Sequence, residues 1–306
     1  MRAAVVDLGT NTFNLLIAEK KEGKYVEIYR DKCSVKLGKG GLAQNVIASD
    51  AYQRALNAID NYYKQINHYQ VKTIKVVATS AFRTTQNGLQ LAEEIKHRIG
   101  TDVDIIDGDE EAKYIYYGIR EAVPLTDKNV LMVDIGGGSN ELIIGNKHTI
   151  TWKKSYKLGI SRLIEMFKPN DPLTPSDIKT ISEYIRTETS DLTDILYKYP
   201  LNTLVGSSGS FDLIANILHY KDHNIPIDLT KTYNVLNVWH FFRLLDTLII
   251  SSYEQRQDMP GMDMTRIEMI PIAALFIRTI AENFTCKQVL HSAYAIKEGV
   301  WIKNFM

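Results

Sequence analysis

Short runs of hydrophobic residues alternate with turn-forming residues along the first third of the chain. This pattern predicts strands over residues 3–7, 14–20, 25–32, 73–79 and 102–106. Between them, apolar side chains recur at helical spacing over residues 51–68, 88–99 and 109–118, with Ser49 as an N-cap and Gly100 as a stop signal. Strands alternating with helices predict an α/β fold for this part of the chain.

The second part of the chain begins like the first and then becomes mainly helical. Strands alternate with turns again from residue 130 to about 155. Helices are predicted over residues 161–167, 175–197, 211–218, 238–252 and 265–282, followed by a strand at 288–291 and a terminal helix at 295–305. Because 306 residues exceed what one hydrophobic core usually organises, we expect two domains, residues 1–120 and 121–294, with the terminal helix of about 295–306 packing back on the first.

The two strand-rich regions open on the same sequence pattern. Residues 6–18 align without gaps on residues 133–145, at an offset of 127 residues. Each copy reads as a strand ending in Asp, an aliphatic residue, a glycine, a turn rich in hydroxyl and amide side chains, and a second strand. Two halves with the same opening hairpin predict a duplicated fold with a cleft between the halves.

The repeated loops, residues 7–14 and 134–141, suit phosphate. Turns rich in Gly, Ser, Thr and Asn let successive backbone N–H groups point into one concavity, where phosphate oxygens can be bound. Asp7 and Asp134 end the first strand of each copy, and two facing carboxylates together with water and phosphate oxygens are a typical Mg²⁺ environment. Neither loop leads into a helix and neither carries a P-loop lysine, so they are not Walker A or Rossmann elements. One such loop alone would be an ordinary glycine-rich hairpin; the pair favours a phosphate site.

Composition narrows the class of ligand and compartment. Lys and Arg together number 36, as do Asp and Glu, so no net positive charge attracts nucleic acid and an anionic ligand must be bound by local groups. The two cysteines, Cys33 and Cys286, follow neither a zinc nor a disulfide pattern. No stretch of about 20 mostly apolar residues occurs, as a membrane span requires. A cytoplasmic protein that binds neither membrane nor nucleic acid is therefore expected.

With these motifs, the sequence resembles the exopolyphosphatase/guanosine pentaphosphatase (Ppx/GppA) family in its short two-domain form, within the actin/hexokinase/Hsp70-like superfamily. The resemblance is carried by residues 6–13, 78–83, 108–112 and 133–141, and then by 157–162, 260–266 and 297–299. It implies duplicated actin-like (ribonuclease H-like) α/β domains, with mixed sheets flanked by helices and the active site in the interdomain cleft.

The resemblance also implies the catalytic carboxylates. Glu111, the second Glu of a Glu-Glu-Ala motif, is expected to activate the attacking water. Without the resemblance, Glu110 and Glu111 would more readily be explained as acidic residues that complement a helix dipole. Glu141 is expected beside the metal or the water. Its counterpart in the first loop is Asn14, so the two loops share a scaffold but not a charge.

Phosphate ligands are expected from both loops and from three further segments. They are Thr10, Asn11, Thr12, Arg83, Gly137, Gly138, Ser139, Ser208 and Arg266. Arg83 follows a strand, and a guanidinium can grip a phosphate with two nitrogens; Arg266 and Arg162 would equally suit surface ion pairs. The bulk of Ser208, in place of a Gly-Gly-Thr-like loop of the family, argues against an adenine pocket. The implied cofactor is Mg²⁺ or Mn²⁺, held by Asp7, Asp134 and Glu141.

The activity that the resemblance favours is Mg²⁺-dependent removal of the terminal phosphate from inorganic polyphosphate. Hydrolysis of guanosine pentaphosphate is the nearest alternative, because no residue decides whether guanosine is recognised. A kinase of the same fold and a non-catalytic sensor of polyphosphate or guanosine alarmones are two further alternatives. A homodimer is common in the family, and the sequence offers no independent sign of one.

Overall fold

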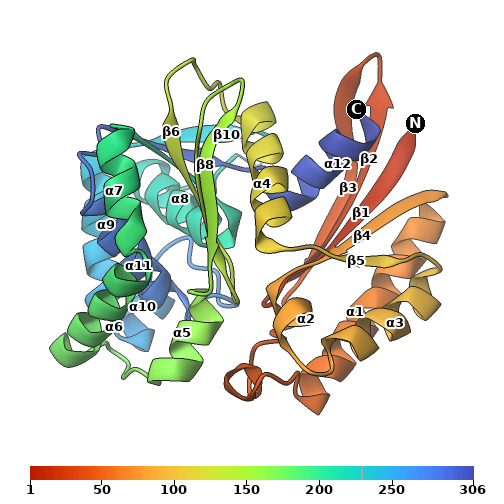
Figure 1. The fold of residues 1–306 in the computed structure, drawn as a ribbon, viewed down its shortest axis with the longest axis horizontal. Helices are drawn as coiled ribbons and strands as arrows, with labels where there is room; N and C mark the ends of the chain where they lie inside the picture. The colour runs from red at the N-terminus through yellow and green to blue at the C-terminus, as the bar shows by residue number, and fades with distance from the viewer. Residues whose placement is uncertain (229) are drawn as a thin grey trace.

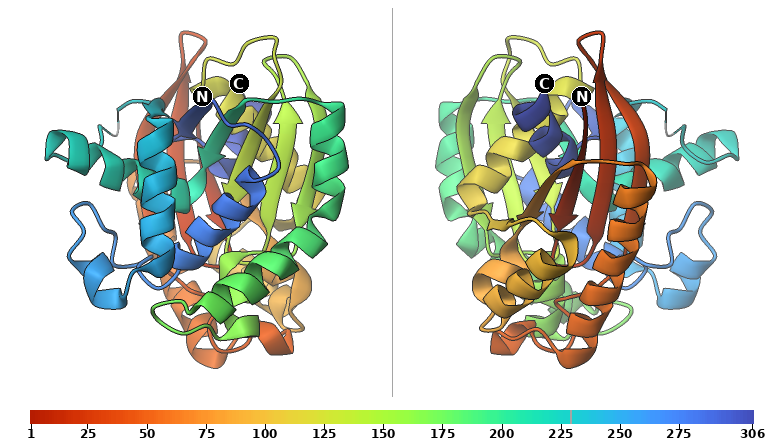
Figure 2. Two further views of the ribbon diagram at one scale, coloured as in Figure 1. Left: turned by 90° about the vertical axis from the view of Figure 1, so that its left-hand side faces the viewer. Right: turned by 90° about the vertical axis from the view of Figure 1, so that its right-hand side faces the viewer.

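Two mixed β-sheets, each with helices packed against it, form the two halves of the molecule (Figure 1). They are seen in a computed structural model that describes residues 1–228 and 230–306. Both chain termini lie at the same end of the molecule (Figure 2). The first strand and the last helix are in contact there.

The first sheet has the strand order β3-β2-β1-β4-β5. Its strands are β1 (Arg2–Leu8), β2 (Phe13–Lys21), β3 (Lys24–Cys33), β4 (Thr73–Ala78) and β5 (Val103–Ile105). The first three are antiparallel, and β4 and β5 continue the sheet in parallel with β1. The accompanying helices are η1 (Leu42–Gln44), α1 (Ser49–His68), α2 (Ser80–Thr84), α3 (Gly88–Ile99) and α4 (Gly108–Ala122). In the right-hand view of Figure 2, α1 runs across the outer face of this sheet.

The second sheet has the order β10-β11-β9-β6-β7-β8. Its strands are β6 (Val130–Ile135), β7 (Asn140–Gly145), β8 (Ile150–Tyr156), β9 (Thr203–Ser207), β10 (Tyr233–Leu236) and β11 (Gln288–Ser292). Starting from β8, the order β8-β7-β6-β9-β11 repeats that of the first sheet, with β10 added antiparallel at the edge. The duplication predicted from two hairpins thus extends over five strands, and the predicted fold class is confirmed.

Eight helices of the described chain follow the second opening hairpin. They are α5 (Ile160–Phe167), α6 (Pro175–Glu188), α7 (Ser190–Lys198), α8 (Ser208–His223), α9 (Val238–Ile250), α10 (Tyr253–Gln257), α11 (Ile270–Ala281) and α12 (Ile296–Phe305). The largest hydrophobic core lies in this half, where α6, α8, α9 and α11 pack together and against the sheet. Helix α11 is the most deeply buried of these helices, since it exposes only Arg278 partly.

Several boundaries differ from the prediction, for local physical reasons. The single helix expected over residues 175–197 is two helices, because Thr189 leaves helical geometry at φ −108° and ψ 20°. The helix expected from residue 265 begins at Ile270, with Pro271 in the first turn, where its missing N–H costs nothing. The helix expected from residue 211 begins at Ser208. The sequence reading missed α2, α10, β9 and β10, each of which has at most five residues and too little periodicity to be recognised.

Two crossing helices, α4 and α12, join the halves. Helix α4 packs its apolar side against the second sheet, whereas α12 packs against β1 and β2 of the first (Figure 1). Their backbones meet at two glycines: a Cβ on Gly299 would lie 1.7 Å from the Tyr114 carbonyl oxygen, and one on Gly118 would lie 2.2 Å from that of Ala295. The crossing therefore requires glycine at both positions.

The substitution Gly299→Ala tests this crossing. Without the contact, alanine in a helix would stabilise by up to about 1 kcal/mol. Because its Cβ would overlap a backbone carbonyl, we instead expect the free energy of unfolding to fall by about 2–3 kcal/mol. Urea denaturation measures the change, with Asn304→Ala at an exposed position of the same helix as the control. A stabilised Gly299→Ala protein would contradict the described packing.

Within residues 1–228 and 230–306, no helix combines the length and hydrophobicity that crossing a membrane requires.

Candidate active site

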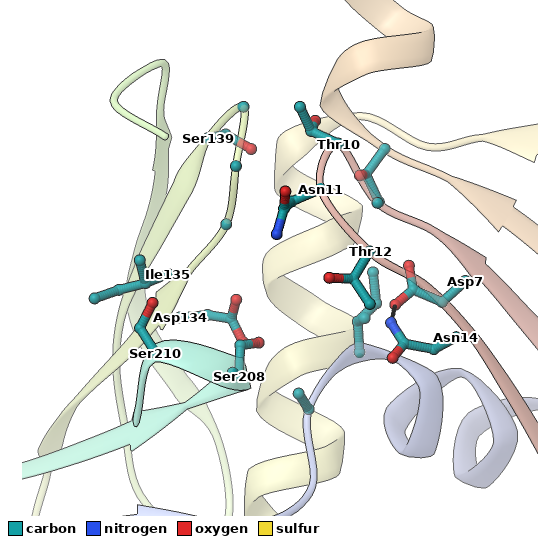
Figure 3. A pocket seen from close by; sticks show the side chains of 18 of the residues that line it. Asp7, Thr10, Asn11, Thr12, Asn14, Asp134, Ile135, Ser139, Ser208 and Ser210 are labelled. Atoms are coloured by element: carbon teal, nitrogen blue, oxygen red, sulfur yellow. Dashed lines mark hydrogen bonds between the residues drawn. The ribbon is translucent and has the colours of Figure 1, made fainter. Parts of the chain in front are cut away.

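The two repeated loops face each other across one cleft between the halves (Figure 3). Thr10, Asn11 and Thr12 come from the first loop and Ser139 from the second. The loops approach so closely that a Cβ on Gly138 would lie 2.6 Å from both the Thr10 and the Ser80 hydroxyl oxygens. Glycine is therefore required where the second loop passes the first.

Both loops have the same hydrogen-bonded turn. The Gly9 N–H donates to the Thr12 carbonyl at 3.1 Å, and the Gly136 N–H donates to the Ser139 carbonyl, also at 3.1 Å. Directly beneath each turn, the strand-ending Asp is paired with the residue seven positions later: Asp7 with Asn14, and Asp134 with Glu141. The internal sequence repeat therefore corresponds to a repeat of backbone geometry, with the same turn hydrogen bond and the same cross-strand pairing in both copies.

The two aspartates on the walls of the cleft are held by neighbouring side chains. The Asn14 amide donates to Asp7 Oδ2 at 2.9 Å. The hydroxyls of Ser207 and Ser208 both donate to Asp134 Oδ2, each at 2.6 Å. Asp7 and Asp134 are only 5% and 6% exposed. Each carboxylate is therefore fixed in orientation and largely withdrawn from water.

Two glutamates are fixed in the same way. The Ser155 hydroxyl donates to Glu141 Oε1 at 2.6 Å, and Arg83 Nη1 donates to Glu111 Oε2 at 3.1 Å. Glu111 sits in the first turn of α4, which is capped by Asp107 accepting from the Glu110 N–H. Glu111 lines the cleft; Glu141 is buried and is not among the described residues that line it.

Burial and mutual repulsion raise the pKa of all four carboxyls. Burial raises the pKa of Asp7 from 3.8 to about 7, with Asp134 contributing, and that of Glu141 from 4.5 to about 7, again with Asp134 contributing. Burial and the charge of Glu141 raise the pKa of Glu111 well above its usual range. The pKa of Asp134 is also raised by burial, against the hydrogen bonds from Ser207 and Ser208. The cleft thus holds a concentration of negative charge that a cation would relieve.

A hard cation fits this donor set. Among the residues that the structure describes, no three His, Cys, Asp or Glu side chains converge closely enough to enclose a metal ion. Asp7 and Asp134 instead stand on opposite walls (Figure 3), so water or ligand oxygens would have to complete the coordination. That is the usual situation of Mg²⁺, which takes one or two carboxylates and keeps oxygen ligands from water and phosphate. The buried Thr10 hydroxyl also lacks a hydrogen-bond partner among the described residues.

The cleft brings together most of the residues expected to bind phosphate. Thr10, Asn11, Thr12, Gly137, Gly138, Ser139, Ser208 and Arg266 all line it. Arg83 is not among the described lining residues, and its guanidinium donates to Glu111 and to the Ile106 carbonyl. Arg162 donates to the Gly138 carbonyl at 3.3 Å and to the Thr84 hydroxyl at 3.4 Å. In this arrangement Arg83 orients a glutamate, and Arg162 supports the second loop.

Several residues of the cleft were missed by the sequence reading. The most informative is Lys297, at the start of α12, whose Nζ lies 2.9 Å from Glu298 Oε1. Its charge lowers the pKa of both Asp7 and Asp134, against the larger effect of burial. Ser80, Ser210 and Asp212 also line the cleft. The Lys297-Glu298-Gly299 motif was recognised from the sequence, but only the fold shows that its lysine lines the cleft.

Ser208 adopts a backbone conformation that serine rarely takes. Its φ is +67°, in the left-handed region, at the first residue of α8. This conformation costs on the order of 1 kcal/mol for a residue with a Cβ. The same residue donates a hydrogen bond to Asp134, so the backbone strain is located at the cleft.

The repeated sheet, with one hairpin loop on each side of a single cleft, defines the actin-like class of duplicated α/β proteins. Residues 16–305 match the Ppx/GppA phosphatase family. The chain therefore belongs to the Ppx/GppA phosphatase family.

Known relatives are similar over nearly the whole chain. A crystal structure of an exopolyphosphatase from Cytophaga hutchinsonii is 33% identical, with a TM-score of 0.95 over 99% of this chain and 97% of that one. A putative exopolyphosphatase of Haemophilus influenzae is 24% identical over 97% of this chain and 89% of its own length. A guanosine-5'-triphosphate,3'-diphosphate pyrophosphatase of Photobacterium profundum is also 24% identical, and this chain spans 58% of its length. The chain thus spans little more than half of the relatives that carry the latter name.

Backbone strain at Ser208 can be isolated by comparing two substitutions. Ser208→Ala and Ser208→Gly both remove the hydroxyl, but only glycine adopts a positive φ freely. We expect the glycine variant to be more stable than the alanine variant by about 1 kcal/mol, as measured by urea denaturation. At Ser176, an exposed residue within α6, the order should reverse because alanine is the better helix former. An equally or more stable Ser208→Ala protein would exclude the strain.

The raised pKa values predict how stability depends on pH. Because the pKa of Asp7 is about 7 in the fold against an ordinary 3.8, the folded state binds a proton between these values that the unfolded state lacks. The metal-free protein should therefore lose stability as pH rises from 3.8 to about 7.

Replacing Asp7 tests this sign. At pH 8 without metal, Asp7→Asn should raise the free energy of unfolding by about 1–3 kcal/mol and flatten its pH dependence. Urea denaturation in chelator at pH 5.5 and 8 measures both. Asp194→Asn, at an exposed position, is the control and should change neither. Loss of stability in Asp7→Asn at pH 8 would mean that the carboxylate is not destabilised by burial.

Proposed function

We propose that this chain removes the terminal phosphate of inorganic polyphosphate by hydrolysis, releasing orthophosphate. The observation that carries the proposal is the position of Glu111: a buried carboxylate on the first turn of α4, lining the same cleft as both repeated loops. The similarity to the exopolyphosphatase of Cytophaga hutchinsonii supports the same activity.

In this proposal the two loops and the nearby cations bind the end of the phosphate chain. Backbone N–H groups and hydroxyls of both loops bind phosphate oxygens, with Arg266 and Lys297 supplying positive charge. Asp7 and Asp134 would hold Mg²⁺ or Mn²⁺ together with water and phosphate oxygens, and Glu141, the cross-strand neighbour of Asp134, would support this site from behind the cleft wall. When bound, the ion would neutralise charge on the phosphate oxygens. Without such a cation, a bound phosphate would bring further negative charge close to the four buried carboxylates.

Glu111 acts as the general base on the attacking water. Its raised pKa makes the ionised carboxylate a stronger base than an exposed glutamate. The hydrogen bond from Arg83 fixes its orientation and favours its charged form. Water activated at Glu111 would attack the terminal phosphorus, and the shortened chain would leave with the charge of the broken phosphoanhydride bond.

Guanosine pentaphosphate is a second candidate substrate, which the names of several relatives support. Its hydrolysis to the tetraphosphate breaks the same kind of bond and would use the same residues. A kinase is less well supported because Ser208 adds bulk where an adenine pocket would lie. A non-catalytic sensor is less well supported because binding alone does not require a glutamate placed to activate water.

Three further properties belong to the same proposal. The chain would work in the cytoplasm, bind neither nucleic acid nor membrane, and form a homodimer as family members commonly do. Residues 1–120 and 121–294 would act as two lobes, with residues 295–306 joined to the first. Since α4 packs on the second sheet and α12 on the first, these two helices would join the lobes.

Replacing the proposed base tests the activity. Glu111→Gln is nearly isosteric but cannot accept a proton, so we expect kcat for orthophosphate release to fall about 100-fold or more. The assay uses Mg²⁺ with polyphosphate, guanosine pentaphosphate and ATP in parallel. Glu110→Gln is the matched control, because Glu110 is its exposed neighbour in the same motif and outside the described lining of the cleft.

The outcomes separate the parts of the proposal. If the wild-type protein releases phosphate from neither polyphosphate nor pentaphosphate, the hydrolase proposal is wrong. If Glu111→Gln retains the wild-type rate, only the assignment of the base is wrong. Preference between the first two substrates decides which of the two activities this chain has.

A further inference from the structure

A fourth acidic residue, Asp212, lines the cleft and takes no part in the reaction described above. It lies on α8, one helical turn after Ser208, which donates to Asp134. By charge alone, a carboxylate here should repel a phosphate chain. Its presence therefore calls for a role that outweighs this repulsion.

Asp212 is anchored by a hydrogen bond with a buried histidine. His291 Nε2 lies 2.9 Å from Asp212 Oδ1, and His291 is 4% exposed. On its other side, His291 Nδ1 lies 3.3 Å from the Asn234 side-chain amide nitrogen. Asn234 and His291 are directly opposite each other in the β10–β11 ladder. If the amide donates to Nδ1, the histidine proton is on Nε2 and is donated to Asp212.

Two cations of the cleft, Arg266 and Lys297, act on Asp212 electrostatically, and within the described chain neither is at ion-pair distance from it. Arg266 packs its guanidinium on Gly209, where an added Cβ would lie 1.8 Å from Nη2. Gly209 is in the first turn of α8, three residues before Asp212. Lys297, Arg266 and Asp212 line both this cleft and the adjoining cavity of about 530 Å³. The side chain of Asp212 is 56% exposed, and the hydrogen bond from His291 together with the charges of Arg266 and Lys297 lowers its pKa to about 2, so it stays ionised.

Arg266 also has a competing partner outside this cluster. Its charge acts on Asp263, which forms an ion pair with Lys32 of the first half at 3.4 Å. Without Asp212, Arg266 would be drawn toward Asp263, away from the start of α8.

We propose that Asp212 is a positioning residue whose charge keeps Arg266 at the start of α8, toward the phosphate chain, and that His291 and Asn234 in turn fix Asp212. The proposal rests on the function proposed above, since it assigns Arg266 to the substrate phosphates. It makes a prediction opposite in sign to that of simple charge repulsion. Removing the Asp212 charge should weaken the binding of a polyanion.

The test is a double-mutant cycle on Asp212→Asn and Arg266→Ala, with polyphosphate as substrate. We expect Asp212→Asn to raise KM about tenfold, within the range of coupling between neighbouring residues, with a smaller change in kcat. Adding Asp212→Asn to Arg266→Ala should then change KM little further, because the group through which Asp212 acts is gone. Asp222→Asn removes a charge from the same helix outside the described lining residues and should leave KM unchanged.

Two readouts separate this proposal from the others. A thermal midpoint of Asp212→Asn equal to that of wild type shows that the change in KM is not loss of fold. Calorimetric binding of inorganic tripolyphosphate to the wild type and Asp212→Asn proteins tests positioning even if no substrate is hydrolysed, so failure of the proposed function remains distinguishable. Unchanged or tighter binding by Asp212→Asn, or fully additive effects in the cycle, would overturn the proposal.

Discussion

Repulsion among four buried carboxylates, those of Asp7, Glu111, Asp134 and Glu141, is the constraint on which the rest of the structure depends. Each is less than 10% exposed, and another acidic side chain raises the pKa of each: Asp134 acts on Asp7 and Glu141, Glu141 acts on Glu111, and Asp212 acts on Asp134. Such an arrangement is costly in a protein without metal or ligand. It persists because two cores, two sheets and a glycine-to-glycine helix crossing hold the carboxylates in place. The fold therefore provides a preorganised site that binding of a cation and phosphate oxygens would stabilise.

Duplication explains how such a site arises, and divergence explains its asymmetry. Both hairpins have the same turn and the same register, so they bring Asp7 and Asp134 to opposite walls of one cleft. At the position that follows each turn, however, Asn14 donates a hydrogen bond to Asp7, whereas Glu141 adds a charge beside Asp134. The first loop thus neutralises part of its own charge, and the second concentrates it. Glu111 lies on α4, which packs against the second sheet.

Much of this could be predicted from the sequence, because the repeated hairpin has strong local signals. Strand, glycine turn and strand are read from neighbouring residues, and the offset of 127 residues aligns the two copies. Lys297 and Asp212 could not be given roles in that way, since both reach the cleft through helix packing and strand order set by residues far away in the chain. The sequence predicts that the Arg83 guanidinium binds phosphate, but it cannot predict the hydrogen bond from Arg83 to Glu111, which depends on side-chain geometry. The left-handed Ser208 is likewise invisible in a motif that names residues but not backbone angles.

The central claim is that the two loops form one cation-dependent phosphate site rather than two independent hairpins. The most direct measurement is the dissociation constant of Mn²⁺ for the Glu111→Gln protein, determined by electron paramagnetic resonance in the presence of tripolyphosphate. The Glu111→Gln substitution is included because it prevents turnover. With that background, Asp7→Asn and Asp134→Asn should each weaken Mn²⁺ binding at least about tenfold, as expected when one member of a shared ligand set is lost. Unchanged Mn²⁺ binding after either substitution would contradict the account, because that loop would then lie outside the site.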